Sequence, residues 1–249
     1  MQTGAPGGDT GPWFAALSQE LMKQADVKAT LDKICQRSLD VVPSGDFAGI
    51  TVRRRRARLE TLAHSHEMAL RCDELQYDLG EGPCAEAAIE DESFLVRSTA
   101  DDPRWPRWGP AVARLGVHSL ISVQLPGTAM DADRDPLGAI NIYARKVDAF
   151  TTSDLARAKL FAIHAANALT TAQQVSTLSD AVEARHQIGV AQGVLTQRYG
   201  IDVERAFGIM QRYSSHANIK LRDVAVSVVE LGELPAAYDD LSRPEKPTG

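Results

Sequence analysis

Hydrophobic and polar positions along the first third of the chain predict helices followed by a pair of strands. The apolar residues of segment 13–42 recur at helical spacing with a break near Asp26, and a Pro-Ser-Gly-Asp cluster ends this region. Two alternating runs, AGITVRR and ARLETLAHS, then predict strands joined by a tight basic turn at 53–56. We interpret that turn as a solvated hairpin tip rather than a nucleic-acid contact, because isolated charge runs are usually solvated. Residues 1–12, rich in Gly, Pro and Thr, are expected to be a disordered lead-in.

The middle of the chain alternates short helical and extended runs. Gly82 and Pro83 indicate a helix start, which predicts a short helix over 85–89 and then a strand over 94–97. A further helix over 111–115 ends at Gly116.

Two β-rich runs, HSLISVQLPG and PLGAINIYAR, follow and are separated by the polar, turn-forming DADRD. A long helix then opens at AFTTSDL, where Thr151 and Asp154 have the spacing of a capping box. The predicted order is helix, strand, strand, helix, strand, helix, strand, strand, helix. It is typical of an α+β domain, with an antiparallel sheet flanked by helices.

The C-terminal part has the pattern of three consecutive short helices. The first runs over 181–199 and ends at Gly200, and Asp202 caps the second. A polar break at 214–218 precedes the third. Each helix has one narrow apolar face, so the three can bury only one another and form a small bundle. The apolar positions of the second and third are Ala206, Phe207, Ile209, Met210, Tyr213, Leu221, Val224, Ala225, Val228 and Val229.

A long connector joins the two parts. Segment 153–199 contains no proline, so continuous helix there would measure roughly 70 Å at about 1.5 Å per residue. Val175, Leu178 and Val182 alternate at spacings of three and four, and the seam continues to Arg185 and Gly189. Because the flanks are polar and leave no wide face to bury, we predict a dimerising coiled coil over 171–184. The alternative is one amphipathic helix that folds back on its own domain.

Composition limits the classes of function. The 249 residues include 27 basic and 33 acidic side chains, a net charge of -6, which argues against coating nucleic acid through bulk charge. No apolar run approaches the ~20 residues of a membrane span, and the N-terminus lacks the features of a secretory signal. The odd number of cysteines suits a reducing compartment. We therefore expect a soluble cytoplasmic protein without a membrane partner.

The C-terminal segment resembles the ANTAR domain, a three-helix RNA-binding module of bacterial transcription antitermination regulators. The match keeps the order and the gaps of the family pattern over the whole segment. One departure is Gln192, which stands where many members carry lysine. The matching positions are Arg185, Ile188, Gly189, Ala191, Gly193, Leu195, Tyr199, Gly200, Ala206, Phe207, Ser214, Asn218, Lys220, Leu221 and Ala225.

This resemblance implies a set of RNA-facing residues and a target, a pair of stem-loops in nascent mRNA whose stabilisation prevents an overlapping terminator. Lys220 and Arg222 are the expected phosphate contacts, and Arg185 is a base or phosphate contact. Glycine inside a helix costs about 1 kcal/mol relative to alanine, so two at i and i+4 suggest close approach of RNA or of a partner helix. Tyr199, Phe207 and Tyr213 could stack on bases but are expected in the core. The whole implied set is Arg185, Gly189, Gln192, Gly193, Thr196, Ser214, Asn218, Lys220 and Arg222.

The preceding domain resembles a GAF sensor domain. The GEGPC segment, the PLGAINI run at 136–142 and the helix start at 150–154 carry the resemblance, together with their order. GAF followed by ANTAR is a recurrent arrangement, notably in high-GC bacteria. We expect the GAF domain over 13–170, the ANTAR domain over 181–237 and a flexible tail over 238–249.

Candidate chemistry in the sensor domain is limited. Cys84 follows a helix start, where a thiolate would be favoured, although a buried apolar role is the favoured alternative. Trp105 and Trp108 could line a small-molecule pocket with it, or could anchor their loop. We expect no metal site, including at His64 and His66. The pattern identifies no cofactor and no nucleophile–base pair, so no catalytic residue is assigned.

Three hypotheses of function follow. The first is a ligand-regulated, dimeric, RNA-binding antitermination regulator that is not an enzyme. The second is a GAF-type thiol redox enzyme similar to free methionine sulfoxide reductases, for which the helical tail would have no role. The third, a DNA-binding helical regulator, is weakened by the acidic balance and by the absence of a basic recognition helix.

Overall fold

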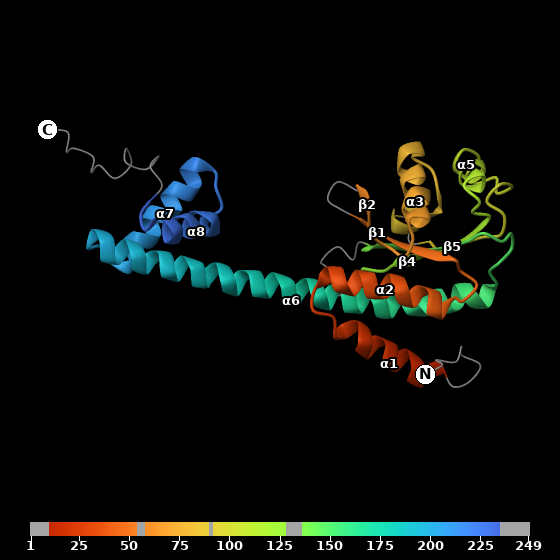
Figure 1. The fold of residues 1–249 in the computed structure, drawn as a ribbon, viewed down its shortest axis with the longest axis horizontal. Coiled ribbons are helices and arrows are strands. Elements are labelled where there is room, and N and C mark those ends of the chain that lie inside the picture. Colours follow the sequence, from red (N-terminus) through yellow and green to blue (C-terminus); the bar gives the residue numbers. More distant parts are fainter. Residues whose placement is uncertain (1–9, 54–57, 90–91, 128–135, 235–249) are drawn as a thin grey trace. The chain divides into compact units, whose positions relative to one another are not determined.

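The protein was analysed as a computed structural model that describes residues 10–53, 58–89, 92–127 and 136–234. The chain forms two compact units, residues 1–175 and 176–249 (Figure 1). The elements in order are α1 Thr10–Met22, α2 Val27–Val41, β1 Phe47–Arg53, β2 Leu59–His64, α3 Glu67–Leu79, α4 Pro83–Ile89, β3 Phe94–Val96, α5 Trp108–Arg114, β4 Ser119–Leu125, β5 Gly138–Ala144, α6 Thr152–Tyr199, α7 Val203–Ala217 and α8 Leu221–Leu231.

Several expectations concern segments beyond these ranges. Most of the basic turn, the DADRD loop, residues 1–9 and the tail over 238–249 lie outside the described residues. Helix α1 begins at Thr10, so the helical region starts three residues inside the segment expected to be a lead-in.

The five strands form one antiparallel sheet in the order β2-β1-β5-β4-β3. Strand β5 is central and pairs with both β1 and β4, with Ile140 opposite Ile50 and Ile142 opposite Ile121. The expected antiparallel sheet with flanking helices is therefore confirmed.

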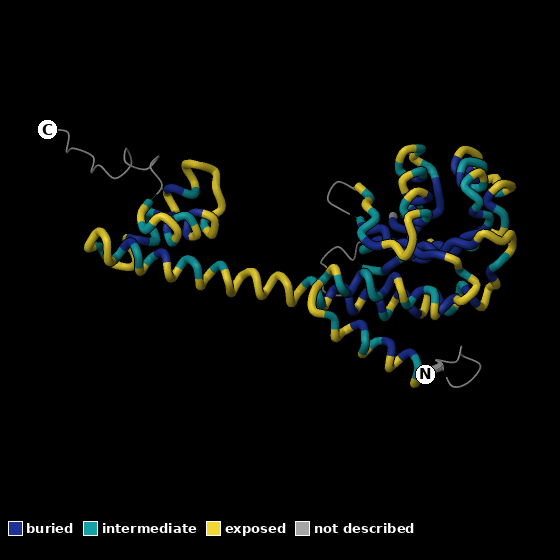
Figure 2. Tube along the Cα trace, in the orientation of Figure 1, coloured by how far each residue is buried: buried dark blue, intermediate teal, exposed yellow. Residues whose placement is uncertain are grey.

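The sheet separates two different cores, because successive side chains of a strand point to opposite faces. In Figure 1, α2 and the first part of α6 cover one face, whereas α3 and α5 lie on the other. The face toward α2 and α6 is lined by aliphatic residues such as Ile50, Ile140 and Ile142. The opposite face mixes aromatic residues with the polar side chains Thr51 and Asn141. Figure 2 shows the sheet between them as buried.

Helix α3 is absent from the predicted order, and its burial pattern explains why. Its buried residues are Ala69, Cys72, Asp73 and Gln76, so two of the four positions that face the sheet are polar. A search for apolar residues at helical spacing cannot detect such a face. His66 also departs from expectation, because it is the N-cap of α3 rather than a strand residue.

The first turn of α6 contains the predicted capping box. The backbone N–H of Thr151 donates to Asp154 Oδ2 at 2.8 Å, and the backbone N–H of Asp154 donates to Thr151 Oγ1 at 3.2 Å. Arg157 forms an ion pair with the same carboxylate. From there α6 continues without interruption to Tyr199, as the absence of proline predicts.

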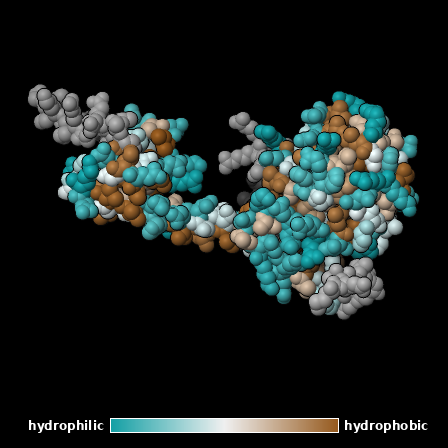
Figure 3. All heavy atoms as spheres, in the orientation of Figure 1, coloured by the Kyte–Doolittle hydropathy of each residue, from teal (hydrophilic) through white to brown (hydrophobic). Residues whose placement is uncertain are grey.

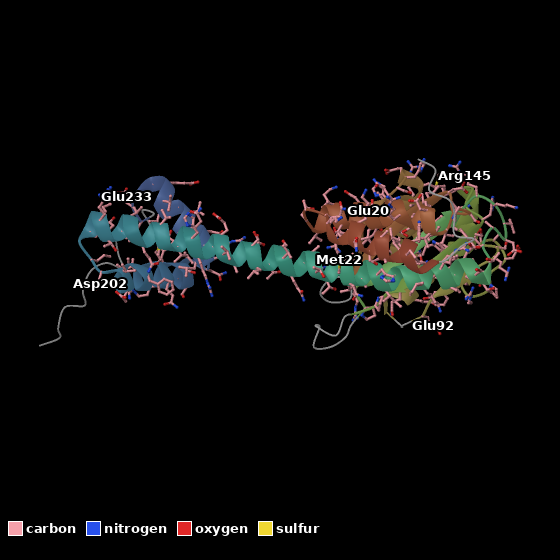
Figure 4. The ribbon with its side chains drawn as sticks, turned by 90° about the horizontal axis from the view of Figure 1, so that it is seen from below. Glu20, Met22, Glu92, Arg145, Asp202 and Glu233 are labelled. Carbon is pink, nitrogen blue, oxygen red and sulfur yellow. The ribbon has the colours of Figure 1, made fainter. Side chains whose placement is uncertain are left out.

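The second unit is a three-helix bundle formed by the end of α6 with α7 and α8. Its core contains Ala191 and Leu195 from α6, with partners from the other two helices. Gly200, at a φ of 62°, ends α6, and Asp202 caps α7 by accepting a hydrogen bond from Arg205 N at 2.6 Å, both as predicted. Asp202 is labelled in Figure 4, as is Glu233, which follows α8 and forms an ion pair with Arg198 of α6.

The capping box gives a first testable prediction. Replacing Thr151 by alanine removes the acceptor of the Asp154 N–H and should lower the free energy of unfolding of the first unit by about 1 kcal/mol. Denaturant unfolding followed by tryptophan fluorescence measures this unit alone, because all three tryptophans precede residue 175. The matched control is Thr152→Ala, whose hydroxyl makes no hydrogen bond in the described residues. Equal losses in the two variants would contradict the prediction.

Candidate functional site

Four of the residues expected to face RNA on α6 lie on one side of the helix, and three of them are exposed. At about 100° per residue, Arg185, Gly189, Gly193 and Thr196 fall on one side of the helix, whereas Ala191 faces the bundle core. Arg185 and both glycines are exposed, and Arg185 forms no ion pair with any described residue. A Cβ added at either glycine would meet no atom within 4 Å. Packing within the unit therefore does not require glycine at these two positions.

Three members of the expected RNA-facing set already make contacts inside the bundle or are buried. The amide of Gln192 donates to Val203 O at 3.1 Å and so ties α6 to the start of α7. The hydroxyl of Ser214 donates to Ile219 O at 2.6 Å across the turn between α7 and α8. The hydroxyl of Thr196 is buried and has no hydrogen-bond partner in the described part of the chain. Each has a structural environment that the spacing alone did not reveal.

The turn between α7 and α8 holds the other three members. Asn218 is the C-cap of α7 in the left-handed conformation, with a φ of 53°. Lys220 is exposed at the N-cap of α8, and its side chain makes no capping hydrogen bond. Arg222 is half-exposed and contacts Asp223, Nε to Oδ1, at 3.2 Å. Lys220, in contrast, forms no ion pair with a described carboxylate.

The aromatic residues of the bundle divide between core and surface. Tyr213 is buried in the bundle core, as expected, whereas Phe207 is half-buried and is not one of the described residues that pack against that core. Tyr199 is 49% exposed at the end of α6, so its expected burial is wrong. The chain turns at Gly200 directly after it and leaves this ring in solvent, where an aromatic face is available for stacking.

Sequence reasoning missed a group of cations on α7. Arg205, Arg212 and His216 are exposed and lie at positions i, i+7 and i+11, on one side of the helix. The spacing was available from the sequence, but the family pattern assigns no RNA contact there.

In the first unit, Cys84 is a buried thiol. Its Sγ lies 2.9 Å from Thr51 Oγ1 and is fully buried, and burial raises the pKa of Cys84 well above its ordinary value. Burial likewise raises the pKa of Cys72, and that of Cys35 to about 12. All three cysteines are free and buried. The structure therefore places Cys84 as a buried thiol beside a polar neighbour.

Trp105 and Trp108 are fully buried and pack edge to face, with ring centroids 6.2 Å apart. The indole N–H of Trp105 donates to Glu86 Oε1 at 2.6 Å, on α4. The indole N–H of Trp108 donates to Cys72 O at 3.2 Å, on α3. These contacts attach the start of α5 and the loop before it to α3 and α4. Anchoring of the loop therefore explains why both indole rings are buried.

A buried polar cluster occupies the same side of the sheet and was not predicted. Its centre is Asp73 of α3, which is fully buried. The carboxylate accepts hydrogen bonds from Tyr143 Oη at 2.5 Å, from Asn141 Nδ2 at 2.9 Å and from Thr61 Oγ1 at 2.9 Å. A Cβ on Gly49 would lie 2.7 Å from Asp73 Oδ2, so glycine on β1 makes room for the carboxylate.

The cluster extends from Asp73 to α4. Tyr77 Oη lies 2.8 Å from both Thr51 Oγ1 and Thr61 Oγ1. Gln76 donates to Tyr143 Oη at 3.2 Å and accepts from the backbone N–H of Cys84 at 2.7 Å. Hydrogen bonds therefore connect α3 and α4 with β1, β2 and β5.

Burial raises the pKa of Asp73 to about 7, and the three donated hydrogen bonds oppose a larger rise. The neighbouring Glu74 adds a smaller effect in the raising direction. An acid whose pKa is higher in the folded chain than in the unfolded chain, near 3.9, holds a proton in the folded state between these two values. Its contribution to stability is complete below about pH 4 and is lost as the pH rises through about 7.

The described residues form neither a metal site nor a membrane-spanning helix. Among the residues that the structure describes, no three His, Cys, Asp or Glu side chains group closely enough to hold a metal ion. Within the same ranges, each helix is too short or too polar to span a lipid bilayer.

The protonation of Asp73 yields the second prediction. Between pH 5 and pH 8 the free energy of unfolding of the first unit should fall on the order of 1–3 kcal/mol further in the wild type than in Asp73→Asn, which carries no titrating carboxyl. Denaturant titrations at each pH, read by tryptophan fluorescence, measure the difference. Asp78→Asn, an exposed acid on the same helix, is the matched control and should follow the wild type. Identical pH profiles for all three proteins would contradict the assigned proton.

Comparison with solved structures identifies the fold of the first unit. A GAF sensor protein from Burkholderia vietnamiensis is 15% identical, with a TM-score of 0.50, over 67% of this chain and 99% of that one. A bacteriophytochrome from R. palustris is 10% identical, with a TM-score of 0.54, over 82% of this chain and 47% of that one. A free methionine-R-sulfoxide reductase from Neisseria meningitidis is 13% identical over 70% of this chain and 98% of that one, and its TM-score of 0.48 carries no argument. The likeness shows the shared fold alone.

No curated protein matches the chain. Two family models do match it, one after the other. The GAF domain model covers residues 24–170, more than half of the chain, and the ANTAR domain model covers residues 176–229. Both resemblances found in the sequence are thereby confirmed, and the chain belongs to the GAF family and carries an ANTAR domain after its GAF domain.

Proposed function

We propose that the protein is an RNA-binding transcription antitermination regulator, in which the GAF domain receives a signal and the ANTAR domain binds tandem stem-loops in nascent mRNA. The observation that carries the proposal is the ANTAR match over a bundle that exposes Arg185 and Lys220 without ionic partners in the described residues. Acting on nascent transcripts requires that the protein work in the bacterial cytoplasm.

The chemistry of the exposed groups suits an RNA loop. Unstacked loop bases are recognised by stacking and by hydrogen bonds to their edges, and phosphates by cations. Arg185 offers five donors in a planar fork, Lys220 offers a compact charge, and Tyr199 offers an exposed ring. Gly189 and Gly193 leave the surface of α6 flat, so a loop can approach the helix backbone closely. Their alternative occupant is a partner helix.

Exposed apolar residues of α6 that precede Arg185 support a homodimer. Val175, Leu178 and Val182 are 59%, 68% and 61% exposed, and no part of the described chain covers them. Figure 3 shows the apolar atoms of this segment of α6 at the surface. Leu160 and Ile163 of the first unit are also exposed on α6. Exposed apolar residues at spacings of three and four are the pattern of a two-stranded coiled coil, which a second copy of α6 would complete.

Helix α6 also offers a route for the signal. Its first half packs in the aliphatic core of the GAF domain through residues such as Phe161 and Leu169, and its last third belongs to the ANTAR bundle. A ligand that changes the packing of the GAF domain could rotate or re-register the seam. Such a shift would change the spacing of two RNA-binding bundles. In this scheme a ligand would bind near Cys84, Trp105 and Trp108. Its effect would reach the rest of the domain through their hydrogen bonds to β1, α4 and α3.

The alternative, a thiol redox enzyme, is disfavoured by the environment of the cysteines. Reactive thiols are exposed and have a lowered pKa, whereas all three thiols here are buried with a raised pKa. Turnover of methionine sulfoxide that depends on any of the three would restore this alternative.

The third prediction tests RNA binding by the full chain. A synthetic RNA with two stem-loops should bind more tightly than the same RNA with scrambled loops and than duplex DNA. Arg185→Ala and Lys220→Ala should each weaken binding on the order of tenfold, because each removes an unpaired cation from the surface. Fluorescence anisotropy with labelled RNA measures the affinities.

Arg114→Ala is the matched control for this experiment. It removes an exposed arginine from α5 in the first unit and should leave the affinity unchanged. Equal affinity of the wild type for the two-stem-loop RNA and for the other nucleic acids would rule out the proposed function.

The fourth prediction tests the seam. Replacing Leu178 and Val182 together by glutamate places like charges along the expected interface and should raise the dimer dissociation constant at least about 100-fold. Sedimentation equilibrium measures the change. Ser179→Glu adds a charge on the adjacent side of the same helix and should leave the dimer intact. A monomeric wild type, or a double variant that dimerises normally, would rule out this interface.

A further inference from the structure

Helix α7 presents a basic face that neither the family pattern nor the predicted site includes. Arg205, Arg212 and His216 fall within about 40° of one another around the helix axis, over about 16 Å of its length. We call these three residues the α7 stripe. The buried residues of α7, Ala206, Met210 and Tyr213, point in another direction toward the core, so packing does not require cations here.

Two other arginines of the second unit have carboxylate partners among the described residues, which the arginines of the α7 stripe do not. Arg198 forms an ion pair with Glu233, and Arg222 contacts Asp223. Within the described residues, Arg205 and Arg212 form no ion pair. In a chain with a net charge of -6, two unneutralised arginines on one side of a short helix form a local positive surface.

The surroundings of Arg212 suit a sugar–phosphate backbone. Gln211, Arg212, Ser215 and His216 line a shallow, open area of the surface and combine amide, hydroxyl and guanidinium donors. Arg212 Nη1 lies 3.7 Å from the position of a Cβ on Gly208, so the guanidinium lies along the helix surface beside the glycine. Hydrogen-bond donors beside a cation match phosphate oxygens and ribose 2′-hydroxyls.

The bundle also needs RNA contacts beyond the expected set. Gln192 and Ser214 make hydrogen bonds within the bundle, Thr196 is buried at its hydroxyl, and Asn218 caps α7. The side chains of Gln192, Ser214 and Thr196 are therefore not free to bind RNA without breaking a structural hydrogen bond or exposing a buried group, whereas Asn218 caps α7 through its backbone N–H and keeps an exposed side chain. The remaining free cations of the expected set are Arg185 and Lys220, which can neutralise few phosphates.

We propose that the α7 stripe is a second RNA contact surface of this domain, at which Arg205 and Arg212 bind the phosphate backbone of the RNA. This inference rests on the proposed function and extends it from the Arg185 side of α6 and the turn before α8 to the outer side of α7. The contact is electrostatic and does not select sequence, because cations that bind phosphates fix position rather than read bases.

Salt dependence tests the inference on the full chain. The probe is the two-stem-loop RNA, titrated by fluorescence anisotropy at several salt concentrations. Arg205→Ala combined with Arg212→Ala should weaken binding at least about tenfold at about 0.1 M salt. The slope of log affinity against log salt should decrease by roughly 1.5, because each phosphate that the protein no longer neutralises lowers the slope by about 0.7–0.9.

Two further variants complete the experiment. Arg212→Lys keeps the charge but loses the planar fork, so it should retain the wild-type slope and lose part of the affinity. Arg71→Ala removes an exposed arginine from α3 and should change neither quantity. Circular dichroism should show unchanged helix content, since the stripe lies outside the bundle core.

The outcomes separate this inference from the proposed function. If the wild type binds the RNA and the double variant binds with the same affinity and slope, the α7 stripe is not an RNA surface. A loss of affinity without a change of slope would also overturn it, because the two arginines would then not have been neutralising phosphates. If the wild type shows no preference for the RNA, the proposed function and this inference both fall.

Discussion

Helix α6 packs in two different environments with one uninterrupted backbone. In the GAF domain it contributes small and aromatic residues, including Ala158, Phe161 and Ala165, to the aliphatic core beneath the sheet. In the ANTAR bundle it contributes Ala191 and Leu195 to a separate core. Between them, residues 176–183 are exposed. An isolated helix of this length is marginal in water, so this segment depends on the packed ends or on a partner.

The two faces of the GAF sheet have different physical characters. The face toward α2 and α6 is aliphatic and can be held by packing alone. The face toward α3 and α4 holds Asp73, whose burial is tolerated because three donors surround the carboxylate. Such a cluster links several elements through directional bonds, so a change at one member affects the others. The side of the sheet that is expected to receive a signal is therefore the side held by polar contacts.

Local signals made much of this fold predictable. The capping box of Thr151 and Asp154, the N-cap Asp202 and the turn at Gly200 each depend on residues close in sequence, and each was found where predicted. Helix α3 was not predictable in this way, because Asp73 and Gln76 occupy core positions of its buried face. Their partners lie on other elements, β2, β5 and α4, so the sequence pattern of α3 alone does not reveal them.

Only part of the candidate site was predictable, because the exposure of some of its side chains depends on neighbouring elements. Position along α6 correctly groups Arg185, Gly189 and Gly193 on one side, since helical spacing alone determines it. Whether Gln192 or Ser214 is free depends on how close α7 and the following turn approach, which no local pattern encodes. The exposure of Tyr199 likewise follows from the direction in which the chain leaves Gly200.

The contact between Gly49 and Asp73 has a consequence for how this sequence can diverge. Any side chain at position 49 would collide with the carboxylate oxygen of residue 73, on a different element. A larger residue at 49 becomes acceptable only after residue 73 has lost its carboxylate, and that loss leaves Tyr143, Asn141 and Thr61 without their common acceptor. The order of substitutions therefore matters, because residue 73 must lose its carboxylate before residue 49 can become larger, and the three donors must then find other acceptors.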